Sequence, residues 1–194
     1  RVLTALFNTL QEPRGRFDVF LALLQFATKT DQVGLISEFL KDLDSHMKKW
    51  GVDASQEDVR RVALLSYRAL QQAKRGGDAQ AMLLKYLQAF NGASVEELNS
   101  VKEHASNAVL QELVDPLVNR GERSVHGARH ALLQFDAVKN LKGHPEHGAL
   151  IEALLASSTG DVAALKRPGT ISEEQFQIIV ENTRLVSLCT VSTD

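Results

Sequence analysis

Histidine supplies the first candidate chemistry, because the chain has six histidines and two of them stand one helical turn apart. His126 and His130 have the i, i+4 spacing that places two imidazole rings on one helix face, where they could bind zinc. Gly127 follows His126, where a zinc-protease helix has a glutamate, and no third ligand is evident. We therefore expect surface or partly buried histidines and no metal site.

Other catalytic patterns are equally weak. The Gly76-Gly77 pair is followed by Asp78, where a phosphate-binding loop requires Lys and then Ser or Thr, and the sequence has no G-x-S-x-G motif. The single cysteine, Cys189, excludes an internal disulfide framework; its apolar neighbours predict a buried, inert thiol in a reducing compartment. For His144 and His147 we expect a cap or loop role. We predict no catalytic residues, no cofactor and no enzyme.

Basic pairs are the remaining candidates, at Lys48-Lys49, Arg60-Arg61 and Lys74-Arg75. The formal net charge of −2 provides no general attraction for nucleic acid, so any RNA contact would be local, with Arg60, Arg61, Lys74 and Arg75 as the candidates. Acids lie near each pair and no aromatic residue is interleaved for base stacking, which favours solvated helix faces.

The elements that would position these residues are helices, because apolar side chains recur at helical spacing and only four prolines occur. No apolar run is long enough to span a membrane. We expect a helix through Leu10, a break at 12–15, and helices over 17–27, 33–50, 55–75, 78–90, 94–113 and 128–135, from 145 onward and over 172–186. A short turn at 136–141 and a loop at 157–169 separate the later helices, and Pro116 ends the 94–113 helix.

Polar residues at the expected helix starts fit N-caps. We predict caps at Asp31, Ser55 and Asp78, and capping boxes at Ser94 with Glu97 and at Ser172 with Gln175. Two apolar stripes are regular enough to predict the buried faces: Val33, Ile36, Leu40, Leu43, Met47 and Trp50 in one helix, and Leu98, Val101, Ala105, Val109 and Leu113 in another.

Helix pairs starting at Phe17, Ser55 and Ser94 are 38 and 39 residues apart. This spacing is typical of helix-turn-helix solenoids, whose pairs must stack to bury their apolar faces. We therefore predict an all-α fold of stacked helix-turn-helix repeats over residues 1–169. Residues 170–194 would form a last helix that lacks an obvious partner. Because residue 1 is Arg, we expect a piece of a longer protein.

Six short segments of the expected helices occur in an order that resembles the subunit m family of eukaryotic translation initiation factor 3. The segments are R-V-L-T-A-L-F-N-T-L at 1–10, F-D-V-F-L-A-L-L-Q-F-A at 17–27, M-K-K-W-G-V at 47–52, L-L-S-Y-R-A-L at 64–70, H-A-L-L-Q-F-D-A-V-K-N-L at 130–141 and A-L-I-E-A-L-L at 149–155. Each segment alone is weakly specific, and the resemblance rests on their order. The loop at 159–169 is shorter than is usual in the family.

The resemblance implies the PCI-type helical solenoid shared by subunits of the proteasome lid, the COP9 signalosome and initiation factor 3. In that family a winged helix follows the repeats, and it is missing from this chain. The implied role is a non-catalytic cytoplasmic scaffold that binds other initiation factor 3 subunits of the PCI and MPN types and the 40S ribosomal subunit, with RNA contacted indirectly. A scaffold of the signalosome, the lid or an mRNA export complex, or a direct RNA-binding repeat, remains the alternative.

Overall fold

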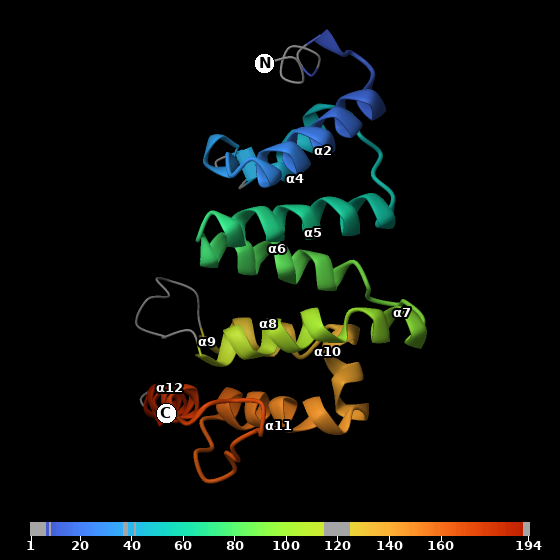
Figure 1. Cartoon of the computed structure of the whole chain (residues 1–194). Coiled ribbons are helices and arrows are strands. Elements are labelled where there is room, and N and C mark those ends of the chain that lie inside the picture. The colour runs from blue at the N-terminus through green and yellow to red at the C-terminus, as the bar shows by residue number, and fades with distance from the viewer. Residues whose placement is uncertain (1–6, 8, 37–38, 41, 115–124, 192–194) are drawn as a thin grey trace. The chain divides into compact units, whose positions relative to one another are not determined.

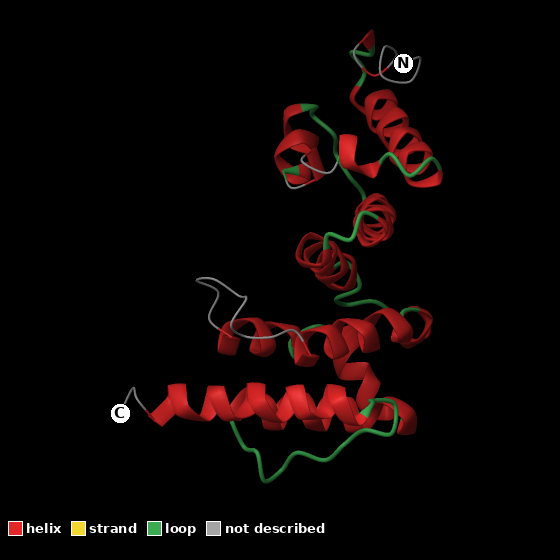
Figure 2. Ribbon diagram, turned by 60° about the vertical axis from the view of Figure 1, so that its left-hand side comes forward, coloured by secondary structure: helices red, strands yellow, loops and turns green. Residues whose placement is uncertain are grey.

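The computed structural model describes residues 7, 9–36, 39–40, 42–114 and 125–191, without the side chains of 35, 125–128 and 189–191. Within these ranges the fold is all-α, as predicted, and no strand occurs (Figures 1 and 2). The elements are α2 (Pro13–Lys29), η1 (Val33–Leu35), α4 (Leu43–Lys49), α5 (Gln56–Gln72), α6 (Gly76–Gln88), α7 (Val95–Ser100), α8 (Lys102–Val114), α9 (Val125–Leu132), α10 (Asp136–Asn140), η3 (Leu141–Gly143), α11 (Pro145–Thr159) and α12 (Glu173–Val191).

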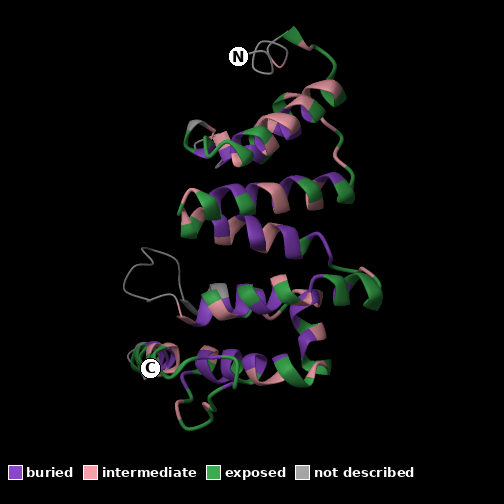
Figure 3. Ribbon diagram, in the orientation of Figure 1, coloured by how far each residue is buried: buried purple, intermediate pink, exposed green. Residues whose placement is uncertain are grey.

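The chain divides into two compact units, residues 1–89 and 90–194. In the first unit α5 packs against α6 on one side and α2 on the other. The buried residues lie on the inward faces of these helices, where the ribbon in Figure 3 is coloured purple. The fully buried positions there include Phe17, Leu24, Val62, Leu83 and Leu87. Apolar burial of this kind, at about 1.5–3 kcal/mol for each large side chain, holds the pairs together.

In the second unit α11 packs against both α8 and α12, and α10 packs against α7 and α8. The last helix therefore has partners, and our prediction of an unpartnered helix was wrong. Ile179 and Val186 are buried, and the Nδ2 of Asn182 donates to the carbonyl of Leu113 at the end of α8, 3.0 Å away. The contact with α8 could not be predicted, because Leu113 and Asn182 are 69 residues apart in the chain, beyond any local pattern.

Polar contacts join successive repeats at a nearly constant separation along the chain. In the first unit, Asp58, Gln72 and Lys85 contact residues 44, 41 and 41 positions earlier. In the second unit, Asp136, Glu146 and His147 contact residues 44, 44 and 41 positions earlier. Stacked repeats produce this pattern because equivalent positions of neighbouring repeats face each other.

Three predicted caps are confirmed. Ser55 begins α5 with a capping box, in which its Oγ accepts from the backbone N–H of Asp58 and the Asp58 carboxylate accepts from the backbone N–H of Ser55. Ser94 and Glu97 form the same box at α7. Before α12, the backbone N–H of Ser172 donates to the Gln175 side chain, and Ser172 Oγ accepts from the Gln175 backbone.

Two other predicted caps were wrong. Asp31 has a positive φ of 55°, in the turn after α2, so it cannot begin a helix. Its carboxylate instead accepts from the Nε2 of Gln72 at 3.1 Å. Asp78 lies within α6, which begins at Gly76 after Arg75, and its carboxylate pairs with the Arg75 guanidinium at 2.8 Å. The glycine pair is thus the first turn of α6 rather than the end of α5, and Lys74, at φ 56°, makes the turn.

Several helix boundaries also differ from prediction. The break expected at 12–15 is instead the start of α2, since Pro13 occupies the N1 position, where a missing N–H costs nothing. The expected 33–50 helix is interrupted, because Asp42 has non-helical dihedral angles before α4 begins. The 94–113 helix is interrupted at Val101 (φ −111°, ψ 9°). Both predicted stripes nevertheless face inward: Val33, Leu40, Leu43, Met47 and all five positions from Leu98 to Leu113 are buried, and Ile36 and Trp50 are half-buried.

Farther along, α9 begins and ends about three residues earlier than predicted, and the expected turn at 136–141 is the short helix α10 followed by η3. The helix expected from Pro145 is confirmed, but it continues to Thr159, so the following loop begins later than predicted. Pro116 and the 119–124 stretch lie outside the described residues. No described helix has the length and apolar character needed to cross a bilayer.

Candidate functional site

The candidate RNA-contacting residues lie at the two ends of α5. Near its start, Arg61 is exposed, whereas Arg60 is half-buried and its Nε donates to the carbonyl of Ala89 at 3.0 Å. Near its end, Lys74 is exposed and Arg75 pairs with Asp78. With a rise of about 1.5 Å per residue, the two ends are separated by roughly 20 Å. The structure therefore does not bring the four basic residues into one patch.

The histidines singled out in the sequence lie in or beside α9 and α11. His130 is exposed in α9, and the side chain of His126 lies outside the described residues. His144 precedes α11 and its Nε2 lies 2.9 Å from the Oδ1 of Asn99. In the part of the chain that the structure describes, no three His, Cys, Asp or Glu side chains gather in a way that could hold a metal ion. The side chain of Cys189 is likewise outside the described residues, so its burial stays a prediction.

His147 differs from our expectation of a cap or loop residue, because it is buried inside α11. Its Nδ1 lies 3.1 Å from the Oγ of Ser106 in α8. Its Nε2 has no hydrogen-bond partner and lies 3.7 Å from a carboxylate oxygen of Glu146 and 3.8 Å from one of Glu103. The ring therefore joins α8 to α11 and serves the packing of the second unit.

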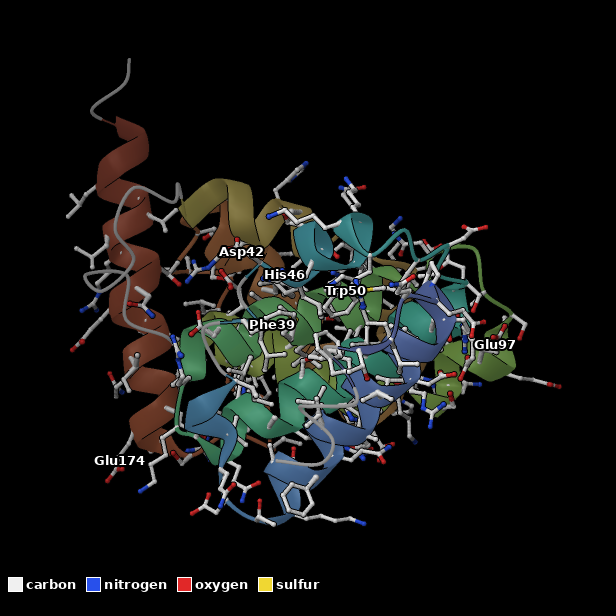
Figure 4. All side chains as sticks on the ribbon, turned by 90° about the horizontal axis from the view of Figure 1, so that it is seen from above. Phe39, Asp42, His46, Trp50, Glu97 and Glu174 are labelled. Atoms are coloured by element: carbon white, nitrogen blue, oxygen red, sulfur yellow. The ribbon has the colours of Figure 1, made fainter. Side chains whose placement is uncertain are left out.

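Aromatic rings gather beside α4 in the first unit (Figure 4). The rings of Phe39 and His46 are stacked with centroids 3.9 Å apart, and the Trp50 ring lies 5.6 Å from Phe39 and 5.6 Å from Phe20. Phe7 meets Trp50 edge-on at 5.1 Å. Because the rings contact one another, they contribute to packing, and the prediction that Trp50 is a packing residue is confirmed.

A groove of about 450 Å³ lies in the second unit between α11 and the α9–α10–η3 segment. Its floor includes Val138 and Ile151, which are buried, and its edge includes Leu155, of which 39% is exposed. The polar side chains around it are His130, Gln134, Lys139, Lys142, Ser158 and Thr159. This arrangement suits the binding of an apolar group that is flanked by negative charge.

Sequence reasoning missed this groove. Its lining residues come from four elements, and none of them forms a recognised motif. The one available signal was Leu155, which helical periodicity places one turn after Ile151 on the same face of the 149–155 segment. Two other leucines, Leu185 and Leu188 of α12, are 41% and 67% exposed. They lie near the end of α12, on a face that also carries the exposed Glu181 and Arg184.

Comparison with known proteins shows a distant relationship. Over 116 residues the chain is 29% identical to a protein of Dictyostelium discoideum named eukaryotic translation initiation factor 3 subunit M. The match covers 58% of this chain and 28% of that protein, so the aligned part is little more than a quarter of the relative's length. No family model and no solved structure matches the chain. The similarity points to a distant relationship and is too low to assign a family.

Proposed function

We propose that this chain is part of a non-catalytic scaffold subunit of a eukaryotic translation initiation factor 3 complex. The observation that carries the proposal is the similarity to the Dictyostelium protein over 116 residues. The all-α fold supports it, because polar contacts in each unit join residues 41 to 45 positions apart, as in stacked repeats. Stacked repeats present extended surfaces for other proteins. The partners are other subunits of PCI and MPN type and the 40S ribosomal subunit, in the cytoplasm, and RNA is contacted indirectly.

The proposal assigns residues 1–169 to helical repeats and residues 170–194 to a helix that leads toward a winged-helix part. The capping box at Ser172 and Gln175, which starts α12 as a new helix, supports that division. Two groups of titratable side chains among the described residues have structural roles. The buried His147 engages Ser106, and the acids Glu96-Glu97 and Glu173-Glu174 stand in first turns of helices, where the macrodipole favours them.

Affinity purification tests the complex. The full-length protein that contains this chain is tagged in its own cells, purified under mild conditions and analysed by mass spectrometry. We expect initiation factor 3 subunits and 40S proteins to be enriched over an untagged control. Enrichment of signalosome, proteasome lid or mRNA export subunits in their place would contradict the proposal and identify the complex instead.

Direct RNA binding through Arg60, Arg61, Lys74 and Arg75 is the second candidate function. The exposure of Arg61 and Lys74 favours it, since exposed cations can reach phosphates. If it holds, the double variant Arg61→Glu with Lys74→Glu binds single-stranded RNA more weakly. The slope of log Kd against log salt concentration should also decrease, by the amount expected for the loss of about two phosphate contacts. The matched control is Lys166→Glu with Arg184→Glu, two exposed cations of the second unit. Equal RNA binding by both double variants would exclude this function.

A further inference from the structure

We propose that the groove between α11 and the α9–α10–η3 segment binds an acidic, amphipathic segment of a partner protein. The occupant is a short helix that places an apolar side chain against Val138 and Ile151 and carboxylates beside Lys139 and Lys142. The proposal deepens the scaffold role and rests on it, since it names the kind of partner chain that this surface selects.

The shape of the groove supports a peptide as occupant. Its volume of about 450 Å³ accommodates a few side chains, whereas a folded domain would contact a wider surface. Its floor is apolar and buried, with Val138 0% and Ile151 1% exposed. Leu155, 39% exposed at the edge, adds apolar area that an incoming side chain would cover. Helix-in-groove recognition uses this combination of apolar floor and exposed edge.

Charge decides which peptide fits. Lys139, Lys142 and His130 are exposed around the groove, and no acidic residue is among the described residues that line it. Asp136 lies 3.3 Å from Lys139, but this pair is solvent-exposed and contributes little. The groove is therefore locally positive in a chain whose formal net charge is −2. Complementary charge raises the association rate and disfavours basic partners.

A second copy of this chain fits less well than a foreign acidic segment. Its candidate insert would be the exposed face of α12, with Leu185 and Leu188. Glu181 and Arg184, both exposed, flank Leu185, so this face carries charges of both signs. It therefore lacks the run of carboxylates that the lysines of the groove would attract.

The test uses the 194-residue chain and a fluorescent peptide of about four helical turns, with leucines on one face and glutamates on the flanks. A peptide with lysine in place of every glutamate is the charge control. Fluorescence anisotropy should show saturable binding of the acidic peptide, at least about tenfold tighter than the basic one, and weaker binding as salt increases.

Variants locate the binding site. Lys142→Glu should weaken the acidic peptide about tenfold, and Leu155→Glu at least as much, whereas Lys166→Glu, an exposed lysine that does not line the groove, should leave binding within about twofold. Both groove positions are exposed, and circular dichroism checks that each variant keeps its helices. Equal effects of Lys142→Glu and Lys166→Glu, or equal binding of the two peptides, would overturn the proposal.

Analytical ultracentrifugation of the free chain separates the remaining outcomes. A mass that rises with concentration and returns to the monomer in Leu155→Glu would show that a second copy fills the groove, which also overturns the proposal. Failure here is distinct from failure of the proposed function. If initiation factor 3 subunits co-purify with the protein but the groove binds no acidic peptide, only the groove proposal fails. If the groove binds the acidic peptide but no initiation factor 3 subunit co-purifies, only the proposed function fails.

Discussion

Arg14 in α2 donates two hydrogen bonds to the carboxylate of Asp58, the N3 residue of α5, at 2.7 and 3.0 Å. The same carboxylate accepts from the backbone N–H and the hydroxyl of Ser55, at 3.2 and 2.8 Å. Asp58 is buried, so one side chain both caps α5 and joins α5 to the preceding helix. The Arg14 guanidinium and then the Ser55 hydrogen bonds lower the pKa of Asp58 to about 2, against the opposing effect of burial.

This lowered pKa predicts acid sensitivity of the first unit. The stabilisation is complete above the ordinary pKa of 3.8 and is lost as the pH falls through about 2, because protonation removes the charge that Arg14 binds. Asp58→Asn should therefore lower the free energy of unfolding by about 1–2 kcal/mol at neutral pH, a discounted value because Arg14 is half exposed. The measurement is urea unfolding at several pH values.

Asp18→Asn is the matched control for Asp58. Asp18 also faces Arg14, at 3.6 Å, but 55% of its side chain is exposed, so its removal should cost no more than about 0.5 kcal/mol. The difference between wild type and Asp58→Asn should shrink between pH 4 and pH 2. A difference that stayed constant over this range would show that the ion pair does not account for the stabilisation.

The parts of the fold that depend on neighbouring residues were predictable, as the capping boxes of Ser55 and Ser94 illustrate. Each box is made by residues three positions apart, so the sequence contains the whole interaction. The apolar stripes were also predictable, because burial of their faces does not require an unbroken helix. The interruptions at Asp42 and Val101 were not predictable, since apolar residues three and four positions apart give the same pattern with or without a local break in the helix.

The groove and the repeat contacts required the structure. Lys142 and Leu155 line one groove only because α10, η3 and α11 turn back on one another, and no spacing rule indicates that. The separation of Arg60 from Lys74 was hidden for a similar reason. Both basic pairs were candidates for RNA contact, but α5 spans Gln56–Gln72, so one pair lies near its start and the other follows its end.

A second prediction concerns the cap of α7. Ser94→Ala should lower the free energy of unfolding of the second unit by about 1 kcal/mol, because the backbone N–H of Glu97 loses its acceptor and the reciprocal bond weakens. Asn107→Ala, at an exposed position of α8, should change it by less than about 0.5 kcal/mol. Thermal unfolding followed by circular dichroism compares the two, and equal shifts would argue against a stabilising cap.

A third prediction concerns Gly160, which ends α11 at φ 73°. A Cβ at this position would lie 2.8 Å from the backbone N and Cα of Ser187 in α12, so the two helices require a glycine at this contact. Gly160→Ala should cost about 2 kcal/mol or more, from the left-handed backbone and the overlap together. Gly143→Ala meets nothing within 4 Å and should cost much less. Similar melting temperatures for the two variants would contradict this packing.

A fourth prediction separates core leucines from surface ones. Leu83 of α6 is 0% exposed, and Leu83→Ala should destabilise the first unit by about 2–5 kcal/mol through lost burial and the cavity that remains. Leu185→Ala removes the same atoms from a side chain that is 41% exposed and should cost less than about 1 kcal/mol. If denaturant unfolding gave equal losses of unfolding free energy for the two variants, the prediction would be wrong and Leu185 would have to be covered by another part of the chain.

The proposal that this chain is part of a scaffold subunit of initiation factor 3 is tested most directly by the stoichiometry of the chain in that complex. Initiation factor 3 would be purified from the same cells through a tag on a different subunit, and its components quantified by mass spectrometry. We expect peptides of this chain at about one copy per complex, retained when the complex sediments with 40S subunits. Absence of the chain from that preparation, together with its presence in signalosome or proteasome lid purified in parallel, would contradict the account.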